Sequence, residues 1–475
     1  MARLIDDRSS DLRWLPVVVL LVLASILPLM TPYPYLAIAP ALGALALFAI
    51  GQRPQIGLYA IIFLIPFGNF RNIAGPLESI KIHWLLALIL LLLLLIRLLV
   101  ERGFVASLRS NLWPWFLLYL AVSLLSSFFS DDHGYVAHQV SLLLVAMLFF
   151  TLTIAMLERE SVTRHIPIVI ALSVSLGSLL AVLGNLTGMS GFSEGATFSR
   201  STGGTTDPNS LALQIIFGMP FLVFWLFHAR HAWSRVFAAI LILINLTALV
   251  GTYSRSGTLV IGVTLLILLI INSRDIRPRR LGLLIVGITG AALLGTAMLP
   301  QTFWERQASL FAEQPDRALS RRFSYLDVAR DAVMERPILG HGPGTFRNLF
   351  AQTDWAQKFH KKGATKRRYA HNTYLEVVVG TGLLGLAAFA GLLITAWRNL
   401  YQASTRLIEK GDRYHGDLVM HYLIAFSALL IFLMFFSDVF QKFMLLCLGL
   451  SQVWLRIASE QEDSSMATHA SESRT

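Results

Sequence analysis

Residues 361–385 read KKGATKRRYAHNTYLEVVVGTGLLG, and within this stretch a basic polar segment gives way to an apolar helix. The polar side ends a segment over residues 300–370 that carries thirteen Lys or Arg, whereas almost all of the chain before it is apolar. A chain that devotes most of its length to lipid-soluble helices and then builds one large basic loop usually works where loop and helices meet. We therefore expect the functional site at this junction.

Composition places the chain among membrane proteins. Hydrophobic residues make up 55% and charged residues 14% of the sequence, and the mean hydropathy is +0.63. An apolar run of about 20 residues spans a bilayer as a helix. No cleavable signal peptide is evident. We predict an all-α polytopic membrane protein with 12–14 transmembrane helices and one large, partly helical loop, from fourteen runs: 14–30, 35–50, 56–70, 82–100, 112–130, 139–157, 165–187, 209–227, 233–252, 256–272, 281–299, 372–397, 419–437 and 439–457.

The distribution of basic residues predicts the orientation. With a cytoplasmic N-terminus and fourteen alternating spans, cytoplasmic segments hold 21 of the 39 Lys and Arg, and the short outer segments hold only 5. The positive-inside rule counts short loops and exempts long translocated ones. Both termini are therefore predicted to be cytoplasmic, and the 300–370 loop to be periplasmic.

The loop carries thirteen basic residues against seven acidic ones. An outward-facing basic surface suits an anionic partner such as phosphate, pyrophosphate or an acidic glycan. The basic residues on the cytoplasmic side are explained by membrane lipid. Nucleic acid is not expected as a partner, because no recognisable nucleic-acid module accompanies the charge.

Five regions follow from these patterns. They are N-terminal spans over 1–199, further spans over 200–299, the loop over 300–370, C-terminal spans over 371–458, and a disordered cytoplasmic tail over 459–475. Within the loop, residues 320–334 predict an amphipathic helix that Pro337 and Gly340 end. Its residues at helical spacing are Phe323, Leu326, Ala329 (or Arg330) and Val333. Residues 361–368 predict a mobile basic run.

Cysteine and histidine patterns give no sign of a metal or cofactor. The single cysteine, Cys447, lies in the last apolar run, which excludes an intramolecular disulfide and a cysteine metal cluster. No histidine and carboxylate pair has the spacing of metal ligands. We expect no metal site and no cofactor.

Two arginines stand in short outer connections that are otherwise nearly free of basic residues. Arg255 lies in the segment 253–257, and Arg200 lies in the Gly/Ser/Thr-rich segment 198–210. An arginine near the bilayer is costly unless it pairs or lines a wet cavity, although a snorkelling side chain at a helix end is an equally common explanation. In the second segment, Asp207 predicts a helix N-cap followed by Pro208, which is also the pattern of an ordinary capped loop.

His371 is the best candidate for a general base. It follows the basic loop directly and opens an apolar helix, with Asn372, Tyr374 and Glu376 beside it. Histidine is the side chain that can shuttle a proton near neutral pH. A lone histidine at a membrane boundary is often structural, so a capping or packing role is the alternative. The segment Gly380–Gly382 indicates close packing.

Taken in order, these motifs resemble the O-antigen ligase and O-antigen polymerase superfamily of bacterial inner membranes. They are YSRSG at 253–257, Arg322 before a segment that ends ERPILGHGPGTF at 335–346, HNTYLE at 371–376 and GTGLLG at 380–385. The resemblance covers roughly residues 200–390. It implies a multi-pass enzyme that takes a glycan from undecaprenyl pyrophosphate at the periplasmic face, without nucleotide sugar or metal.

The resemblance also implies roles for single residues. The membrane-proximal arginine of the family falls on Arg255, its loop arginine on Arg322 or Arg321, and its loop-end histidine on His371. Arginine offers permanent, bidentate donors to phosphate oxygens, and arginine clamps stabilise a departing diphosphate. The further substrate-binding candidates are Arg200, Asp207, Asn209, Asn372, Tyr374 and Arg347.

Three functions remain open from the sequence. An O-antigen ligase transfers the glycan to lipid A–core, and a polymerase transfers it to another lipid-linked repeat. A relative with the same chemistry acts on protein Ser or Thr, or releases exopolysaccharide. A membrane transporter belongs to another class, and it would need ionisable residues along a midplane pathway. The candidates cluster at one face instead, which favours catalysis.

Overall fold

The computed structural model describes residues 39–67, 82–101, 103–157, 163–188, 193–194, 200–205, 207–273, 301–308, 317–359 and 366–472. The predicted spans 14–30 and 281–299 lie outside these residues, as do parts of the basic run at 361–368. The described chain is almost entirely helical, with one two-residue hairpin pairing, and the predicted all-α polytopic fold is confirmed.

Eight described helices are long and apolar enough to cross a membrane. They are α8 (His133–Met156), α10 (Ile166–Thr187), α11 (Pro208–His228), α12 (Ala232–Gly251), α13 (Arg255–Ser273), α19 (Thr373–Glu409), α20 (Arg413–Phe432) and α21 (Lys442–Glu472). Four shorter apolar helices are α3 (Ala39–Gln52), α4 (Gln55–Leu64), α5 (Ile82–Val100) and α7 (Trp113–Ser127). Each of these twelve overlaps a span that the sequence predicts.

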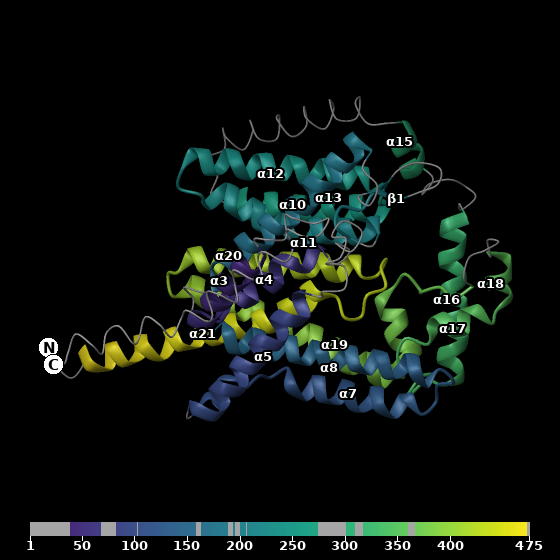
Figure 1. The fold of residues 1–475 in the computed structure, drawn as a ribbon, viewed down its shortest axis with the longest axis horizontal. Helices are drawn as coiled ribbons and strands as arrows, with labels where there is room; N and C mark the ends of the chain where they lie inside the picture. Colours follow the sequence, from purple (N-terminus) through teal and green to yellow (C-terminus); the bar gives the residue numbers. More distant parts are fainter. Residues whose placement is uncertain are drawn as a thin grey trace.

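The remaining described elements are short or lie in the large loop. They are η5 (Ile65–Phe67), α6 (Phe104–Ser107), strands β1 (Ser193–Glu194) and β2 (Arg200–Ser201), α15 (Gln301–Ala308), α16 (Arg317–Glu335), α17 (Phe346–Ala351) and α18 (Asp354–Lys358). Figure 1 shows α16, α17 and α18 together at one end of the bundle, with α16 lying crosswise to the spans. We call this end of the bundle the loop end.

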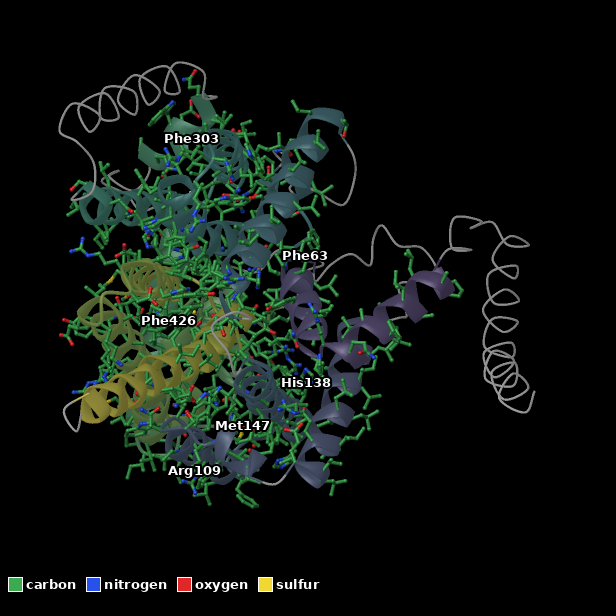
Figure 2. The ribbon with its side chains drawn as sticks, turned by 90° about the vertical axis from the view of Figure 1, so that its left-hand side faces the viewer. Phe63, Arg109, His138, Met147, Phe303 and Phe426 are labelled. Carbon is green, nitrogen blue, oxygen red and sulfur yellow. The ribbon has the colours of Figure 1, made fainter. Side chains whose placement is uncertain are left out.

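The core of the bundle forms around α19, which packs against α7, α20 and α21, while α11 packs against α10, α12 and α20. Aromatic residues fill the space between them: the rings of Phe217 and Phe443 stack with centroids 4.5 Å apart. Figure 2 shows the side chains between the spans, with Phe426 among them, and Phe426 is fully buried. Burial of this apolar surface fixes the spans relative to one another and thus fixes the connections at the loop end.

The amphipathic helix predicted at 320–334 exists as α16, and its predicted apolar face is right in part: Ala329 is buried and Val333 packs against the same cluster, but Phe323 and Leu326 do not face it. Phe323 and Leu326 are 51% and 49% exposed, whereas Tyr325, Val328, Ala329 and Ala332 are buried. These buried residues pack against Phe346, Phe350 and the first turns of α19. A close approach between helices favours small side chains, so the buried face follows the alanines and one tyrosine rather than the largest apolar residues.

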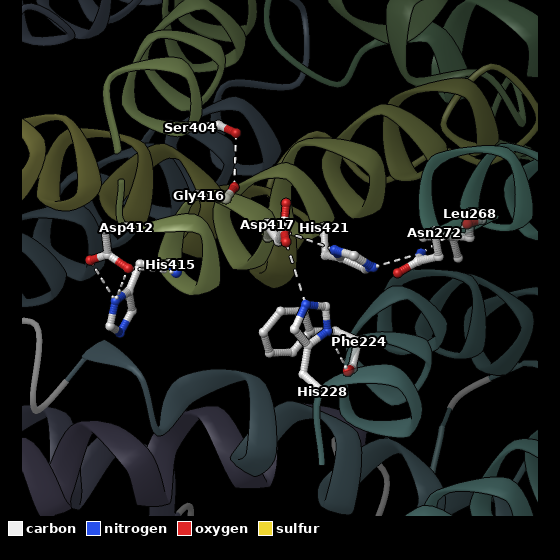
Figure 3. A network of polar contacts seen from close by, with 10 residues as sticks. All are labelled: Phe224, His228, Leu268, Asn272, Ser404, Asp412, His415, Gly416, Asp417 and His421. Carbon is white, nitrogen blue, oxygen red and sulfur yellow. Dashed lines mark hydrogen bonds and ion pairs between the residues drawn. The ribbon is translucent and has the colours of Figure 1, made fainter. Parts of the chain in front are cut away.

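A polar network ties α11, α13 and α20 together at the end opposite the loop (Figure 3). His228 Nε2 lies 3.4 Å from Asp417 Oδ2, and His421 Nδ1 lies 2.7 Å from the backbone oxygen of Asp417. The other ring nitrogen of His421 lies 3.3 Å from Asn272 Nδ2. Because buried polar groups are costly unless partnered, this network holds the three helix ends in register.

Candidate active site

Helix α19 is broken near the loop end. Gly382 adopts φ 66° and ψ −171°, so Thr373–Thr381 forms a short helix of its own before the long span. The loop segment 337–342 bonds to the broken stretch: His341 N donates to Val379 O at 3.0 Å, and Leu383 N donates to Pro337 O at 2.7 Å. A helix break leaves backbone groups without intrahelical partners. The loop supplies those partners, and the close packing expected at residues 380–382 is present.

Ser126 of α7 forms hydrogen bonds to both the loop segment and the broken stretch of α19. Its hydroxyl donates to Gly380 O at 2.6 Å and accepts from Gly342 N at 2.9 Å. Gly342 N also reaches Gly380 O, at 2.8 Å. Backbone from the loop and from α19 thus meet with almost no side chain between them, which explains the glycines on both sides.

His371 stands in a left-handed backbone conformation, with φ 49°. Glu376 and Ser437 hold the residues on either side of it. Ala370 N donates to Glu376 Oε1 at 2.7 Å, and Asn372 N donates to Ser437 Oγ at 3.1 Å. Ser437 Oγ donates in turn to Glu376 Oε1 at 3.2 Å. A non-glycine residue in this region of φ/ψ space costs about 1–3 kcal/mol and persists only when its surroundings enforce it.

Three arginines surround the His371 ring electrostatically. Burial first, and then Arg322, Arg321 and Arg368, lower the pKa of His371 to about 4. The imidazole is therefore neutral at pH 7 and has a lone pair available to accept a proton. The ring of Tyr325, on α16, lies with its centroid 6.1 Å from that of His371. Helix α16 thus delivers both predicted loop arginines to the predicted base.

Arg368 was missed as a site residue because the basic run around it predicts a mobile segment. Its position three residues before His371 could have indicated that it lies near the histidine. Its guanidinium donates to Phe359 O at 3.4 Å, which fixes the chain just before the site.

A cavity of about 610 Å³ opens beside His371. His371 and Glu376 line one part of it, together with Tyr135 and Gln139 of α8 and Tyr369. The start of α11 and the connection between α20 and α21 line the rest, through Thr205, Asp207, Ser210, Gln214, Asp438, Gln441 and Lys442. Of the ten residues predicted from the sequence, His371 and Asp207 line this cavity.

Asp438, Gln214 and Lys442 were not singled out by the sequence. Burial raises the pKa of Asp438 to about 6, and it also raises the pKa of Asp207. Asp438 could have been recognised as a candidate site residue because it is a lone carboxylate between two apolar runs. Gln214 lies on the second turn of α11 and carries no comparable signal.

A second polar group forms at the start of α11. Asp207 is the predicted N-cap and accepts from Asn209 N at 2.8 Å and Ser210 N at 3.2 Å. Arg200 Nε donates to Thr252 O at 2.9 Å, and its charge acts on the Asp207 carboxyl. Asn209 Oδ1 accepts from Ser254 Oγ at 2.9 Å, and Arg255 follows directly as the first residue of α13. Arg200, Asp207, Asn209 and Arg255 thus belong to one neighbourhood.

Residues 237–390 match the family model of the O-antigen ligases. This segment of the chain is similar to the O-antigen ligase superfamily. The matched segment runs from α12 into α19 and contains Arg255, Arg321, Arg322 and His371. No match was found among curated proteins. The match supports a glycosyltransferase of the ligase and polymerase type, and the apolar helices support a multi-pass membrane protein.

Three other candidate substrate-binding residues of this O-antigen ligase relative make contacts within the protein. Asn372 caps the start of α19 by accepting from Tyr374 N at 2.9 Å, and the Tyr374 hydroxyl donates to Leu430 O at 2.9 Å. Arg347, on α17, lies 4.4 Å over the ring of Tyr135 and 5.9 Å from that of Tyr369. Because both tyrosines line the cavity, Arg347 shapes its wall.

Glu376 is expected to act as a positioning residue for His371. Glu376→Ala removes the acceptor that holds Ala370 N and Ser437, so we expect kcat for glycan transfer to fall by about 10- to 100-fold. Glu376→Gln keeps a carbonyl oxygen at the same place and should retain most of the activity. Initial rates at saturating donor, at matched amounts of folded protein, check this. Wild-type kcat in the Ala variant would contradict the role.

Proposed function

We propose that this O-antigen ligase relative transfers a glycan from undecaprenyl pyrophosphate to an acceptor hydroxyl at the periplasmic face of a bacterial inner membrane. The acceptor that we favour is lipid A–core, which makes the protein an O-antigen ligase. The observation that carries the proposal is a neutral, half-buried His371 on which the charges of three arginines act, at the edge of a polar cavity. A base beside a cationic cluster is what the reaction needs.

The chemistry follows from these groups. The acceptor oxygen attacks the anomeric carbon, its proton passes to the His371 imidazole, and the carbon–oxygen bond to the diphosphate breaks with its electron pair leaving on phosphate. Arginines stabilise the charge on the departing diphosphate. A direct displacement of this kind inverts the anomeric centre. None of these steps uses a metal ion held by a described residue.

Donor binding also prepares the base. In the free protein, the arginines keep the pKa of His371 low. A bound diphosphate offsets their positive charge, which raises the pKa of His371 toward its ordinary value and makes it a stronger base. The base is then most effective when the donor is present.

The experiment that tests the function uses the lipopolysaccharide of a deletion strain. Undecorated core together with accumulated lipid-linked polymer supports a ligase. Core that carries a single repeat supports the second candidate, an O-antigen polymerase, and an unchanged pattern contradicts both. Exopolysaccharide in the medium, measured in the same strain, tests the remaining transfer activity.

The orientation is expected to place residues 300–370 outside the cytoplasm and both termini inside. Reporter fusions after Asp316 and at Ser464 check this, because one enzyme reporter is active only in the periplasm and another only in the cytoplasm. The expected outcome is a periplasmic signal from the first fusion and a cytoplasmic one from the second, in line with the charge bias. A cytoplasmic signal after Asp316 would overturn the donor assignment.

Arg255 is expected to bind the donor diphosphate together with Arg321 or Arg322. Arg255→Lys keeps the charge but loses the planar fork, so transfer should fall by about 10- to 100-fold while the protein still inserts. Transfer from purified lipid-linked donor in detergent measures this. Arg235→Lys, at the opposite end of the bundle, is the matched control and should be near wild type. Arg200 variants should show a milder loss. Near-normal transfer by Arg255→Lys would show that a point charge suffices.

A further inference from the structure

The two sides of the cavity differ in chemistry. His371 lies on one side, next to the arginines of α16 and of the segment before the histidine. The other side consists of the first two turns of α11 and the connection between α20 and α21, which Figure 1 shows at the loop end. Asp207, Gln214 and Asp438 line that second side, and the two carboxyl groups act on each other electrostatically. Lys442 lines the same wall and its charge acts on Asp438, so this side offers both acceptors and a donor and suits a ligand rich in hydroxyl groups.

Gln214 is the second and independent sign of a ligand. The residue is only 7% exposed, and its Oε1 atom has no hydrogen-bond partner among the residues that the structure describes. Buried acceptors are almost always partnered, so an orphaned one that lines a cavity marks a place where a ligand or water donates. Gln441, which lines the same cavity, differs because its Oε1 accepts from Met444 N at 2.8 Å.

Aromatic rings also line the cavity. Tyr119, Phe436 and Phe440 line it beside the polar atoms. Binding sites for small organic ligands combine such apolar surfaces with a few placed polar groups. A pyranose presents hydroxyls around its rim and apolar C–H faces, so it matches a wall built from two carboxyls, an amide oxygen and aromatic rings.

We propose that Asp207, Gln214 and Asp438 form the subsite for the acceptor sugar. The proposal rests on the glycosyl transfer proposed above. An acceptor sugar held here has its remaining hydroxyls against these polar side chains and its attacking hydroxyl toward His371. The donor diphosphate lies against the arginines proposed above, and the acceptor sugar reaches His371 from the cavity.

The test uses the purified full chain in detergent, with undecaprenyl-pyrophosphate-linked glycan as donor and lipid A–core as acceptor. Gln214→Leu removes the orphaned acceptor at nearly constant volume. We expect the acceptor KM to rise about tenfold, the effect of one lost hydrogen bond, with donor KM unchanged. Asp438→Asn should give a smaller rise in the same parameter. Gln452→Leu is the matched control, since this glutamine of α21 bonds to Ser110 Oγ and does not line the cavity.

A second measurement detects sugar binding to the subsite in the absence of glycan transfer. Saturation-transfer NMR with core oligosaccharide released from lipopolysaccharide should detect binding to the wild type and weaker binding to Gln214→Leu. An unchanged acceptor KM together with unchanged oligosaccharide binding would overturn the subsite. A rise in donor KM alone would also overturn it, because the donor sugar would then occupy this wall. Wild-type protein that binds the oligosaccharide but transfers no glycan would instead sink the proposed function and leave the subsite standing.

Discussion

His371→Ala is expected to lower glycan transfer by about a thousandfold while donor binding stays largely intact. General-base catalysis by a placed side chain contributes about 10²- to 10⁴-fold, and we propose that the affinity for the diphosphate resides in the arginines. Transfer from purified lipid-linked donor gives the rate, and photo-crosslinking of the donor gives the binding. Wild-type crosslinking with negligible transfer is the expected pair of results.

The control for this experiment is His371→Gln. A purely structural histidine would be replaced well by an amide that keeps hydrogen bonding, whereas a base would not. The backbone on either side of residue 371 is held by hydrogen bonds to Glu376 and Ser437 that do not involve the histidine side chain, so both variants should fold. An active His371→Gln enzyme at matched expression would remove the base assignment and leave a site that only positions substrates through arginines.

The pH dependence distinguishes the base further. With a pKa of about 4 in the free protein, His371 stays in its basic, neutral form through most of the accessible range. The value of kcat/KM reports the free enzyme and should therefore fall only as pH drops toward about 4. Donor binding raises the pKa, so kcat should begin to fall at a higher pH than kcat/KM. Arg322→Gln removes a positive charge and should move the kcat/KM limb upward in pH.

Gly382→Ala is expected to abolish the native junction between loop and α19. The added Cβ would lie 2.2 Å from Ile338 O, and the residue has a φ of 66° that L side chains rarely adopt. Backbone crowds this position, so no side-chain movement can relieve the contact. We expect a loss of more than about 3 kcal/mol of stability and little folded protein after detergent extraction. Fluorescence-detected size-exclusion chromatography measures the folded fraction.

Gly262→Ala provides the matched control. This glycine lies in the middle of α13, and no described atom outside its own helix backbone lies within 4 Å of the place that an added Cβ would take. Alanine has the higher helix propensity, so this variant should fold as well as wild type. Equal folded fractions for Gly382→Ala and Gly262→Ala would show that the break in α19 is not required.

Much of the membrane architecture could be predicted from the sequence, because the length of an apolar run and the bilayer thickness leave little freedom. All twelve described apolar helices overlap predicted spans. The junction at His371 could be predicted for the same reason, since it is where polar and apolar sequence meet. The buried face of α16 was predicted only in part: Ala329 is buried as expected, but the partner surface selects Tyr325 in place of the exposed Phe323 and Leu326.

The parts of the site that the sequence does not reveal are those that depend on distant segments. Asp438 reaches the cavity because the connection after α20 folds back on the start of α19: Thr373 N donates to Leu433 O at 2.9 Å. Gln214 reaches it because α11 packs against α20. Neither contact has a local pattern, so spacing and periodicity carry no information about it. The predicted arginines at 321, 322 and 255 were found through residue type and motif, and their binding roles stay predictions.

The hydrogen bonds of Ser126 have a consequence for how this protein can be divided. The segment that matches the O-antigen ligase family begins at residue 237, yet Ser126 of α7, Asp207 before α11 and Ser437 after α20 all build the site. The family segment is therefore not an autonomous module. A recombinant piece limited to it lacks the groups that close the broken helix and fix the histidine, and grafting it onto other spans cannot transplant the site. The smallest portable unit must include at least α7 through the connection after α20.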